Sequence, residues 1–214
     1  MGEGYDVSIF GGDRGKFKTF RKQAMEAAEI LGARKVVLGY SDNFFPENDF
    51  EAVIDIAKVI KKVNPQIVFI HWLKDRHYDH TRTAKASLEA LTNINRFAGG
   101  KPVELKLKEI YAYEAGLKQT FDFDPDFYVN VTEELEDVFK SLRAFKALGE
   151  EPMVEEKKAQ CRARGNQSRF QYAEAFKFIG PYAPLRSTLP ELLGEDVKPA
   201  GSFMYPWGMR SYMG

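Results

Sequence analysis

The sequence predicts an α/β fold: a Rossmann-like, mostly parallel sheet with helices on both faces. Short apolar runs alternate with amphipathic segments of helical period through the first half of the chain, the pattern of strands joined by right-handed helical crossovers. The strongest run is apolar at every position, as a parallel strand covered on both faces should be. A length of 214 residues with 44% hydrophobic side chains suits one domain, which we assign to residues 1–214.

The first unit of this pattern is a strand at Val7–Phe10, followed by a cluster of glycines within residues 11–15 that predicts a tight turn. An amphipathic helix comes next and is expected to end at Gly32, because glycine favours the turn that stops a helix. A second strand is then expected at Lys35–Leu38.

The second unit begins with a helix over Phe50–Val63, which Asn64–Pro65 should end because the residue before a proline avoids helical geometry. Ile67–Ile70 is the strongest strand of the chain. A further helix is predicted over Thr81–Phe97, closed by Gly99–Gly100.

The second half of the chain has a weaker pattern. Alternating apolar residues predict a strand over Val103–Tyr113, and Thr132 is the expected N-cap of the helix that follows it. Glu155–Ala163 is expected to be helical, and Tyr172–Phe178 is expected to form a short element. From Gly180 onward, several prolines and aromatic residues predict an extended segment on the surface.

Composition excludes several classes of protein. Lys and Arg (31) balance Asp and Glu (31), so there is no basic excess for a nucleic-acid phosphate backbone. The single cysteine, Cys161, excludes a disulfide framework and indicates a reducing compartment, which we expect to be the cytoplasm. No run approaches the ~18 apolar residues of a membrane span, and the first residues do not resemble a signal peptide.

The stretch after Ile67–Ile70 is the first place to look for chemistry, because ligands of such sheets lie beyond the carboxyl ends of the strands. It holds every histidine of the chain together with three charged neighbours: His71, Asp75, Arg76, His77, Asp79 and His80. Neutral imidazole is a good zinc ligand, and a nearby carboxylate can orient the ring or move a proton. Arg82, one turn further, suits an anionic or carbonyl group. The alternative is a solvated polar loop.

Five segments carry a resemblance to a known family. In chain order they are Arg21 with AMEAAEILGA (Ala24–Ala33), VLGYSDN (Val37–Asn43), NPQIVFIHWLKDRHYDHTRTA (Asn64–Ala84), FDPDFYVNVTEELEDVFKSLRAFKA (Phe123–Ala147), and Arg164-Gly165 followed by YAEAF (Tyr172–Phe176). Together they resemble the LmbE/PIG-L-like de-N-acetylase family, zinc hydrolases that remove acetyl groups from N-acetylglucosamine-type sugars.

The resemblance implies a role for each polar residue. His80 matches a zinc ligand, His77 matches the group that stabilises the oxyanion or donates a proton, and Asp79 matches the residue that orients His77. Arg21 corresponds to a substrate-binding arginine, and we assign Arg82 to substrate as well. The implied cofactor is Zn²⁺, and the implied substrate is a small amino-sugar conjugate.

The chain departs from the family at one point. The family's first motif, His-Pro-Asp-Asp, supplies two more zinc ligands and the general base, and it is absent from these 214 residues. We therefore expect the chain to lack an N-terminal βα unit of ~30 residues. Loss of a central strand would expose strand edges, and such a chain would tend to form homo-oligomers.

Three interpretations stay open. The chain is part of an active zinc deacetylase, or it is a non-catalytic family member that binds a sugar, a nucleotide or a partner protein. In the third, GGDRGK (Gly11–Lys16) is a phosphate-binding turn of a nucleotide-binding domain, although its glycines fit neither the dinucleotide fingerprint nor the Walker loop.

Overall fold

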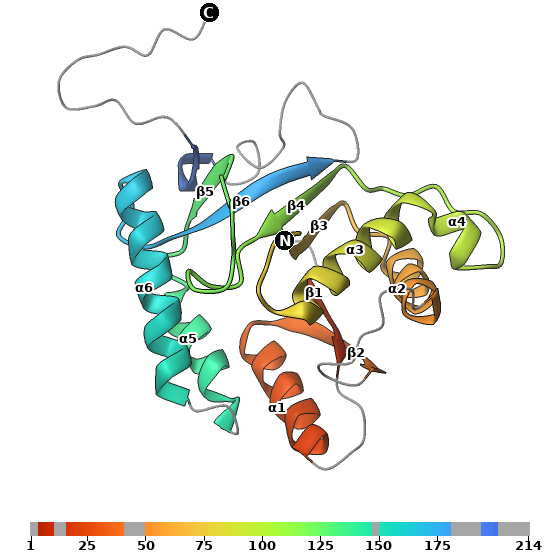
Figure 1. Cartoon of the computed structure of the whole chain (residues 1–214), viewed down its shortest axis with the longest axis horizontal. Coiled ribbons are helices and arrows are strands. Elements are labelled where there is room, and N and C mark those ends of the chain that lie inside the picture. Colours follow the sequence, from red (N-terminus) through yellow and green to blue (C-terminus); the bar gives the residue numbers. More distant parts are fainter. Residues whose placement is uncertain (1–3, 11–15, 41–49, 147–149, 181–193, 201–214) are drawn as a thin grey trace, which may run out of the picture.

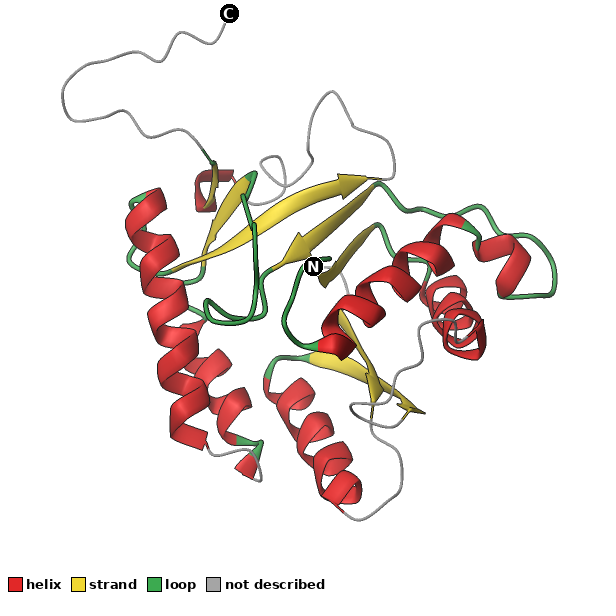
Figure 2. Ribbon diagram, viewed as in Figure 1, coloured by secondary structure: helices red, strands yellow, loops and turns green. Residues whose placement is uncertain are grey.

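The computed structural model describes residues 4–10, 16–40, 50–146, 150–180 and 194–200. Strands occupy the middle of the molecule and helices flank them, with α5 and α6 to the left and α2, α3 and α4 to the right (Figure 1; Figure 2). The α/β class predicted from the sequence is therefore confirmed. The glycine cluster at 11–15, the loop at 41–49 and most of the segment after Gly180 lie outside the described residues.

The first unit is a parallel pair of strands joined by a helix. β1 (Gly4–Phe10) and β2 (Ala33–Tyr40) pair in parallel, and α1 (Lys16–Ile30) connects them. Gly32 has φ +65°, in the left-handed region that glycine adopts at no steric cost, so the expected helix stop is confirmed.

The second unit also contains two parallel strands joined by helices. It consists of α2 (Phe50–Val63), β3 (Ile67–His71), α3 (Tyr78–Thr92), α4 (Ile94–Phe97) and β4 (Glu109–Tyr113). β3 and β4 pair in parallel with helices between them, as the alternation of strand and helix in the sequence predicts.

Two predictions in this unit need correction. The helix expected over Thr81–Phe97 is two helices, because Asn93 leaves helical geometry at φ −122°, ψ 30°. The strand expected from Val103 begins only at Glu109. The residues before it are held by asparagine side chains instead of a neighbouring strand: Val103 N–H donates to Asn95 Oδ1 (2.9 Å) and Lys106 N–H donates to Asn64 Oδ1 (2.8 Å).

The larger sheet corrects the prediction of a mostly parallel fold. Its order is β3-β4-β6-β5-β7, with β5 at Phe127–Asn130, β6 at Ala173–Gly180 and β7 at Val197–Pro199. Only β3 and β4 are parallel, whereas β4–β6, β6–β5 and β5–β7 are antiparallel. The sheet is therefore mixed and mostly antiparallel.

The antiparallel pairing follows from the helices between β5 and β6. α5 (Leu135–Arg143) and α6 (Glu150–Ser168) pack together through a small apolar cluster, and a short connection makes such neighbours antiparallel. They return the chain to the place where β5 ended, so that Val131 N–H donates to the Tyr172 carbonyl (3.1 Å). β6 then starts beside the end of β5 and must run in the opposite direction.

Local contacts fix both ends of this helix pair. The N-cap of α5 is Glu134, not Thr132 as predicted; the Thr132 hydroxyl instead donates to Asn130 Oδ1 (2.7 Å) in the turn before the helix. At the far end, Gly165 lies against the chain as it turns into β6. A Cβ atom at this position would lie 2.7 Å from the Gln171 carbonyl oxygen, so only glycine permits this approach.

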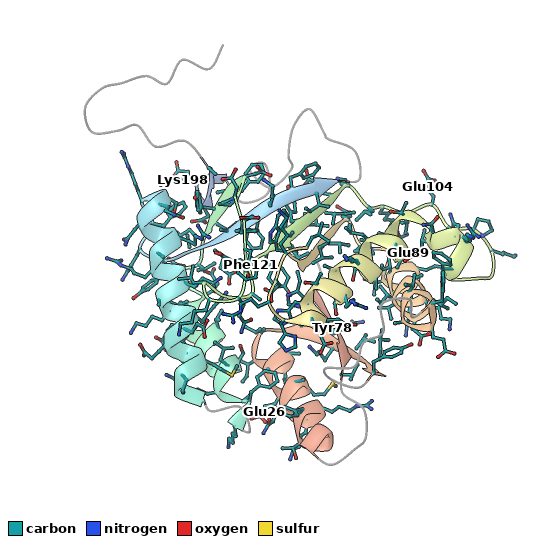
Figure 3. All side chains as sticks on the ribbon, in the orientation of Figure 1. Glu26, Tyr78, Glu89, Glu104, Phe121 and Lys198 are labelled. Carbon is teal, nitrogen blue, oxygen red and sulfur yellow. The ribbon has the colours of Figure 1, made fainter. Side chains whose placement is uncertain are left out.

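The largest core cluster lies between α2, α3, α4 and one face of β3 and β4. Its buried members on the strands are Ile70, Ile110 and Ala112. Figure 3 shows the side chains of the described residues on the ribbon. Leu38 of β2 packs against the same cluster, and Tyr40 of β2 donates a hydrogen bond to Asp55 of α2 (3.1 Å). α2 therefore covers both sheets, although no pairing joins β1 with β3 within the described ranges.

None of the helices in the described part of the chain is both long enough and apolar enough to cross a bilayer. This agrees with the absence of a long apolar run in the sequence.

Candidate functional site

The histidine-bearing loop lies where β3 and β4 end. It leaves β3 at His71 and enters α3 at Tyr78, and it is tied to the segment that follows β4. Trp72 N–H donates to the Tyr113 carbonyl (2.9 Å), and Arg76 N–H donates to the Gln119 carbonyl (2.8 Å). These bonds hold the loop at the carboxyl edge of the parallel strands, where α/β sheets bind ligands.

The three imidazole rings of the chain form one stack. The rings of His71 and His80 lie 4.3 Å apart at an interplanar angle of 3°. On the other side, the rings of His77 and His80 lie 4.5 Å apart at 20°. His80 is therefore the middle ring, and the histidines that the sequence places within ten residues do converge.

Asp75 binds the middle of this stack. Its side chain is 2% exposed, and its Oδ1 atom lies 3.2 Å from Nδ1 of His80. The same oxygen accepts the His77 backbone N–H (2.7 Å), while Oδ2 accepts the Thr120 hydroxyl (3.1 Å). Burial lowers the pKa of His80, and the Asp75 carboxylate opposes this effect.

His71 is the innermost of the three rings. Its Nε2 atom lies 3.1 Å from the Tyr113 hydroxyl, and its Nδ1 atom is buried without a hydrogen-bond partner among the described side chains and backbone. Burial, followed by the neighbouring His80, lowers the pKa of His71 to about 3. The ring is therefore neutral near pH 7.

His77 is the N-cap of α3. Its Nδ1 atom accepts the backbone N–H of Asp79 (3.3 Å). In the neutral ring the proton then sits on Nε2, so Nε2 is a hydrogen-bond donor. Asp79 itself is 1% exposed in the first turn of α3.

The two arginines assigned to substrate are on different helices. The guanidinium carbon of Arg82 lies 3.9 Å from the ring centroid of Tyr78, and both residues are on α3 next to the histidines. Arg21 is exposed on α1, and no hydrogen bond or ion pair between described residues joins it to the histidine stack.

The residues implied to bind zinc fit only in part. His80 has a carboxylate at one ring nitrogen, an arrangement common among metal-binding histidines. Within the part of the chain that the structure describes, however, no group of three or more His, Cys, Asp or Glu side chains could hold a metal ion. These residues alone do not complete a zinc site.

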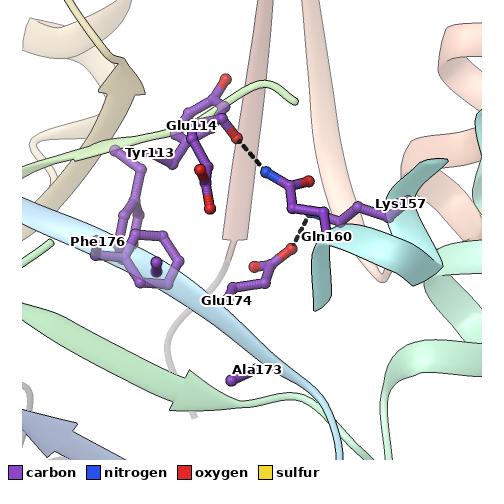
Figure 4. A pocket seen from close by; sticks show the side chains of 9 residues that line it. Tyr113, Glu114, Lys157, Gln160, Ala173, Glu174 and Phe176 are labelled. Carbon is purple, nitrogen blue, oxygen red and sulfur yellow. Dashed lines mark hydrogen bonds and ion pairs between the residues drawn. The ribbon is translucent and has the colours of Figure 1, made fainter. Parts of the chain in front are cut away.

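A cavity of about 410 Å³ lies beside the histidines, at the junction of β3, β4, β6 and α6. Phe69, Tyr113 and Phe176 supply aromatic rings, and polar groups come from Glu114, Lys157, Gln160 and Glu174 (Figure 4). Tyr113 connects the cavity to the histidines through its bond to His71. The volume lies in the range of about 300–1,000 Å³ that is usual for small-molecule sites.

The cations near this cavity are matched by carboxylates. Lys157 forms an ion pair with Glu174, as the dashed line in Figure 4 marks. Arg164 binds both oxygens of Glu114, through Nε and NH2, at 2.6 Å each. Glu174, the carboxylate of the YAEAF segment, therefore serves as the partner of Lys157.

Sequence reasoning did not assign roles to Asp75, Tyr113 or Thr120. Tyr113 ends β4 and pairs with His71, which ends the neighbouring parallel strand, so their side chains meet at one edge. Correct pairing of the two strands would have revealed Tyr113. Thr120 lies near the histidine loop because it forms an isolated antiparallel bridge with Asp75. No pattern in the sequence predicts this bridge.

Comparison with known proteins gives a consistent picture. The family model described as PIG-L, GlcNAc-PI de-N-acetylase, matches residues 4–91, which include the histidine loop. A 4-oxalmesaconate hydratase from Pseudomonas putida is 33% identical over 116 residues, which amount to 52% of this chain. The match spans only 44% of that relative's own length.

Solved structures extend the likeness beyond the histidine loop. The conserved protein TT1542 from Thermus thermophilus is 25% identical with a TM-score of 0.68, over 85% of this chain and 84% of its own. The N,N'-diacetylchitobiose deacetylase from Pyrococcus horikoshii has the same fold, at 21% identity and a TM-score of 0.66, over 85% of this chain and 77% of its own. Deacetylases and hydratases thus share this architecture. Residues 4–91 match the PIG-L/LmbE-like deacetylase family, and the likeness of fold extends over 85% of the chain.

Proposed function

We propose that the protein is an N-deacetylase, which uses water to hydrolyse the N-acetyl group of a small amino-sugar conjugate. The observation that carries this proposal is the histidine stack, in which His77 presents a donor nitrogen beside the neutral rings of His80 and His71. Hydrolysis of an amide needs an activated water, a donor for the tetrahedral oxyanion and a proton for the leaving amine.

His77 and Asp79 are the proposed catalytic residues. The Nε2–H group of His77 suits the oxyanion, because the Asp79 amide already occupies Nδ1. Asp79, buried in the first turn of α3, orients this ring by donating its backbone N–H to His77 Nδ1. Arg82 and Arg21 are the proposed substrate-binding residues.

Members of this family are typically metal-dependent, and we propose Zn²⁺ as the cofactor with His80 as one ligand. When bound, zinc supplies a Lewis acid and an activated water at neutral pH. The remaining ligands must come from residues outside those described, because the described residues offer no complete donor set.

We further propose that the sheet continues between β1 and β3 through one more parallel strand. Within the described ranges each of these strands has one paired edge, and α2 packs over both sheets. A His-Pro-Asp-Asp motif encoded in frame ahead of Met1 would support this proposal. A stop codon at that place would contradict it.

Hydration is a second candidate, favoured by the 33% identity with the Pseudomonas putida hydratase. Hydration and deacetylation both need an activated water, so the same histidines suit either reaction. The two candidates differ in substrate: a conjugated carboxylic acid for a hydratase, a neutral acetamido sugar for a deacetylase.

One experiment separates these functions. Acetate release from N,N'-diacetylchitobiose and from N-acetylglucosaminyl-phosphatidylinositol is measured with added zinc and with a chelator, and hydration of 4-oxalmesaconate is followed by absorbance. The assays use the 214-residue chain and, where the reading frame continues upstream, the extended chain. We expect zinc-dependent acetate release that His77→Gln lowers roughly 10²–10³-fold.

The control for this assay is Lys140→Gln, which changes an exposed lysine on α5 and should leave the rate unaltered. Hydration without acetate release would assign the second candidate. Rates equal to the blank for both reactions in every preparation would contradict the proposal.

A further inference from the structure

We propose that Asp75 is a positioning residue that holds His80 in one tautomer, with the proton on Nδ1 and the lone pair on Nε2. The proposed function enters this inference at one point only, the role of the Nε2 lone pair as a zinc ligand. The tautomer itself follows from the contacts of Asp75.

The hydrogen bonds around Asp75 show which groups donate and which accept. Asp75 accepts the His77 backbone N–H at 2.7 Å, a donor that cannot reverse its role. Its second oxygen accepts from the Thr120 hydroxyl at 3.1 Å. The Thr120 oxygen in turn accepts the Ala115 backbone N–H at 3.2 Å, which leaves its own proton for Asp75. Both oxygens of Asp75 therefore act as acceptors.

An ionised carboxylate can only accept, so the contact of 3.2 Å to His80 requires a proton on Nδ1 of that ring. A neutral imidazole carries one proton, and Nε2 must then hold the lone pair.

The stack keeps this ring in place. The rings of His71 and His77 are both stacked on His80, at 4.3 Å and 4.5 Å, and hold the plane of its ring. The other orientation that keeps this plane is a 180° flip about the Cβ–Cγ bond. Such a flip would place a carbon against Asp75 and lose a charge-assisted hydrogen bond. The side chain of His80 is 24% exposed, so solvent or a ligand can reach it.

Asp75 also holds the histidine loop through its other hydrogen bonds. If this structural role were its only one, replacing Asp75 would leave the His80 tautomer unchanged. The loop bond can be removed separately, because Thr120 binds Oδ2 whereas His80 binds Oδ1. Thr120→Val is therefore a matched control that weakens the loop without touching the contact to the ring.

The test is nitrogen NMR of ¹⁵N-histidine-labelled protein at about pH 7.5, without metal or substrate, where a ring of the ordinary histidine pKa would be mostly neutral. The chain has three histidines, and the signals of His80 are those lost in His80→Gln. We expect His80 to carry its proton on Nδ1 in the unaltered protein and in Thr120→Val. In Asp75→Ala we expect the proton to move to Nε2, with the two ring-nitrogen shifts exchanged.

Asp75→Asn should restore the original pattern, because its amide oxygen can accept the same proton. A proton on Nε2 of His80 in the unaltered protein would overturn the proposal, even if Asp75→Ala does not fold. A folded Asp75→Ala variant that keeps the proton on Nδ1 would overturn it as well. Absence of deacetylase activity would count against the proposed function and leave this result untouched.

Discussion

Cys161 is a residue whose surroundings decide its chemistry. The sequence places it in a polar stretch, yet it is fully buried on α6 and belongs to the core that joins α6 with α5. Burial raises the pKa of the Cys161 thiol to about 11. A thiol that keeps its proton is a poor nucleophile, so Cys161 is a structural residue.

We predict that the native protein does not react with Ellman's reagent at about pH 8 and reacts fully once unfolded in urea. Between its ordinary pKa near 9 and about 11, the folded thiol keeps a proton that the unfolded thiol releases, so stability falls as pH rises through this window. Cys161→Ala should therefore lose less stability than the unaltered protein from about pH 9 to about pH 10.5. Rapid reaction of the native thiol would contradict this prediction.

Single residues also mark how far the sequence predicts the site. His77 and His80 meet as expected, because three histidines in ten residues after a strand must lie near one another. The bond from Asp75 to Thr120 spans 45 positions and depends on how the segment after β4 folds back. Asp75 is visible in the sequence as a neighbour of the histidines, but its partner is not.

Among the elements, α6 is held to the end of β4 by one buried ion pair. Arg164 and Glu114 have side chains that are 12% and 5% exposed, and two parallel hydrogen bonds join them. Removal of one partner leaves the other charge buried and uncompensated.

We predict that Glu114→Gln lowers the free energy of unfolding by about 3–5 kcal/mol, as measured by urea denaturation. The control is Asp122→Asn, which breaks an exposed pair with Lys74 and should cost less than about 1 kcal/mol. Asp122 has φ +50°, a conformation that asparagine tolerates. Equal losses in the two variants would show that burial of the Arg164 pair adds nothing.

The elements that the sequence predicts best are those defined by a local signal, such as a proline or an apolar run. α2 ends at Val63 as Asn64–Pro65 requires, and β3 coincides with the apolar run that defines it. The alternation before β4 is misleading because the Asn64 and Asn95 side chains, not a strand, satisfy that backbone. Residue pattern reports which face is apolar and not which group accepts each hydrogen bond.

For the whole molecule, the two sheets should differ in stability. β1 and β2 form a sheet of two strands, whereas β4 and β6 each have a paired strand on both sides. Two-stranded sheets are marginally stable by themselves, and backbone hydrogen bonds at an open edge exchange through local opening.

We predict that amides of β1 and β2 exchange with deuterium faster than those of β4 and β6 in the 214-residue chain, as measured by mass spectrometry of peptic peptides. An added strand between β1 and β3 should slow exchange in β1 and leave β4 unchanged. Equal protection of both sheets in this chain would show that β1 has a partner already.

At this scale the sequence predicts the fold class and misses the topology. Alternation of strand and helix correctly indicates the two parallel units of the first half. The antiparallel second half depends on the packing of α5 against α6, which sends the chain back beside β5. Two helices in a row carry no sign of whether the next strand will be parallel, so the mixed sheet was not predictable from periodicity.

The return of the chain beside β5 has a consequence for how this protein can change. The segment from 132 to 171 leaves and re-enters the sheet at adjoining points, so its side chains outside the buried core and Gly165 can change while the strands keep their register. That segment carries Lys157 and Gln160, which form one wall of the cavity, whereas the histidines stand on a separate loop. Under the proposed function, substitutions in this wall would change which ligand the cavity fits and leave the histidines unaltered.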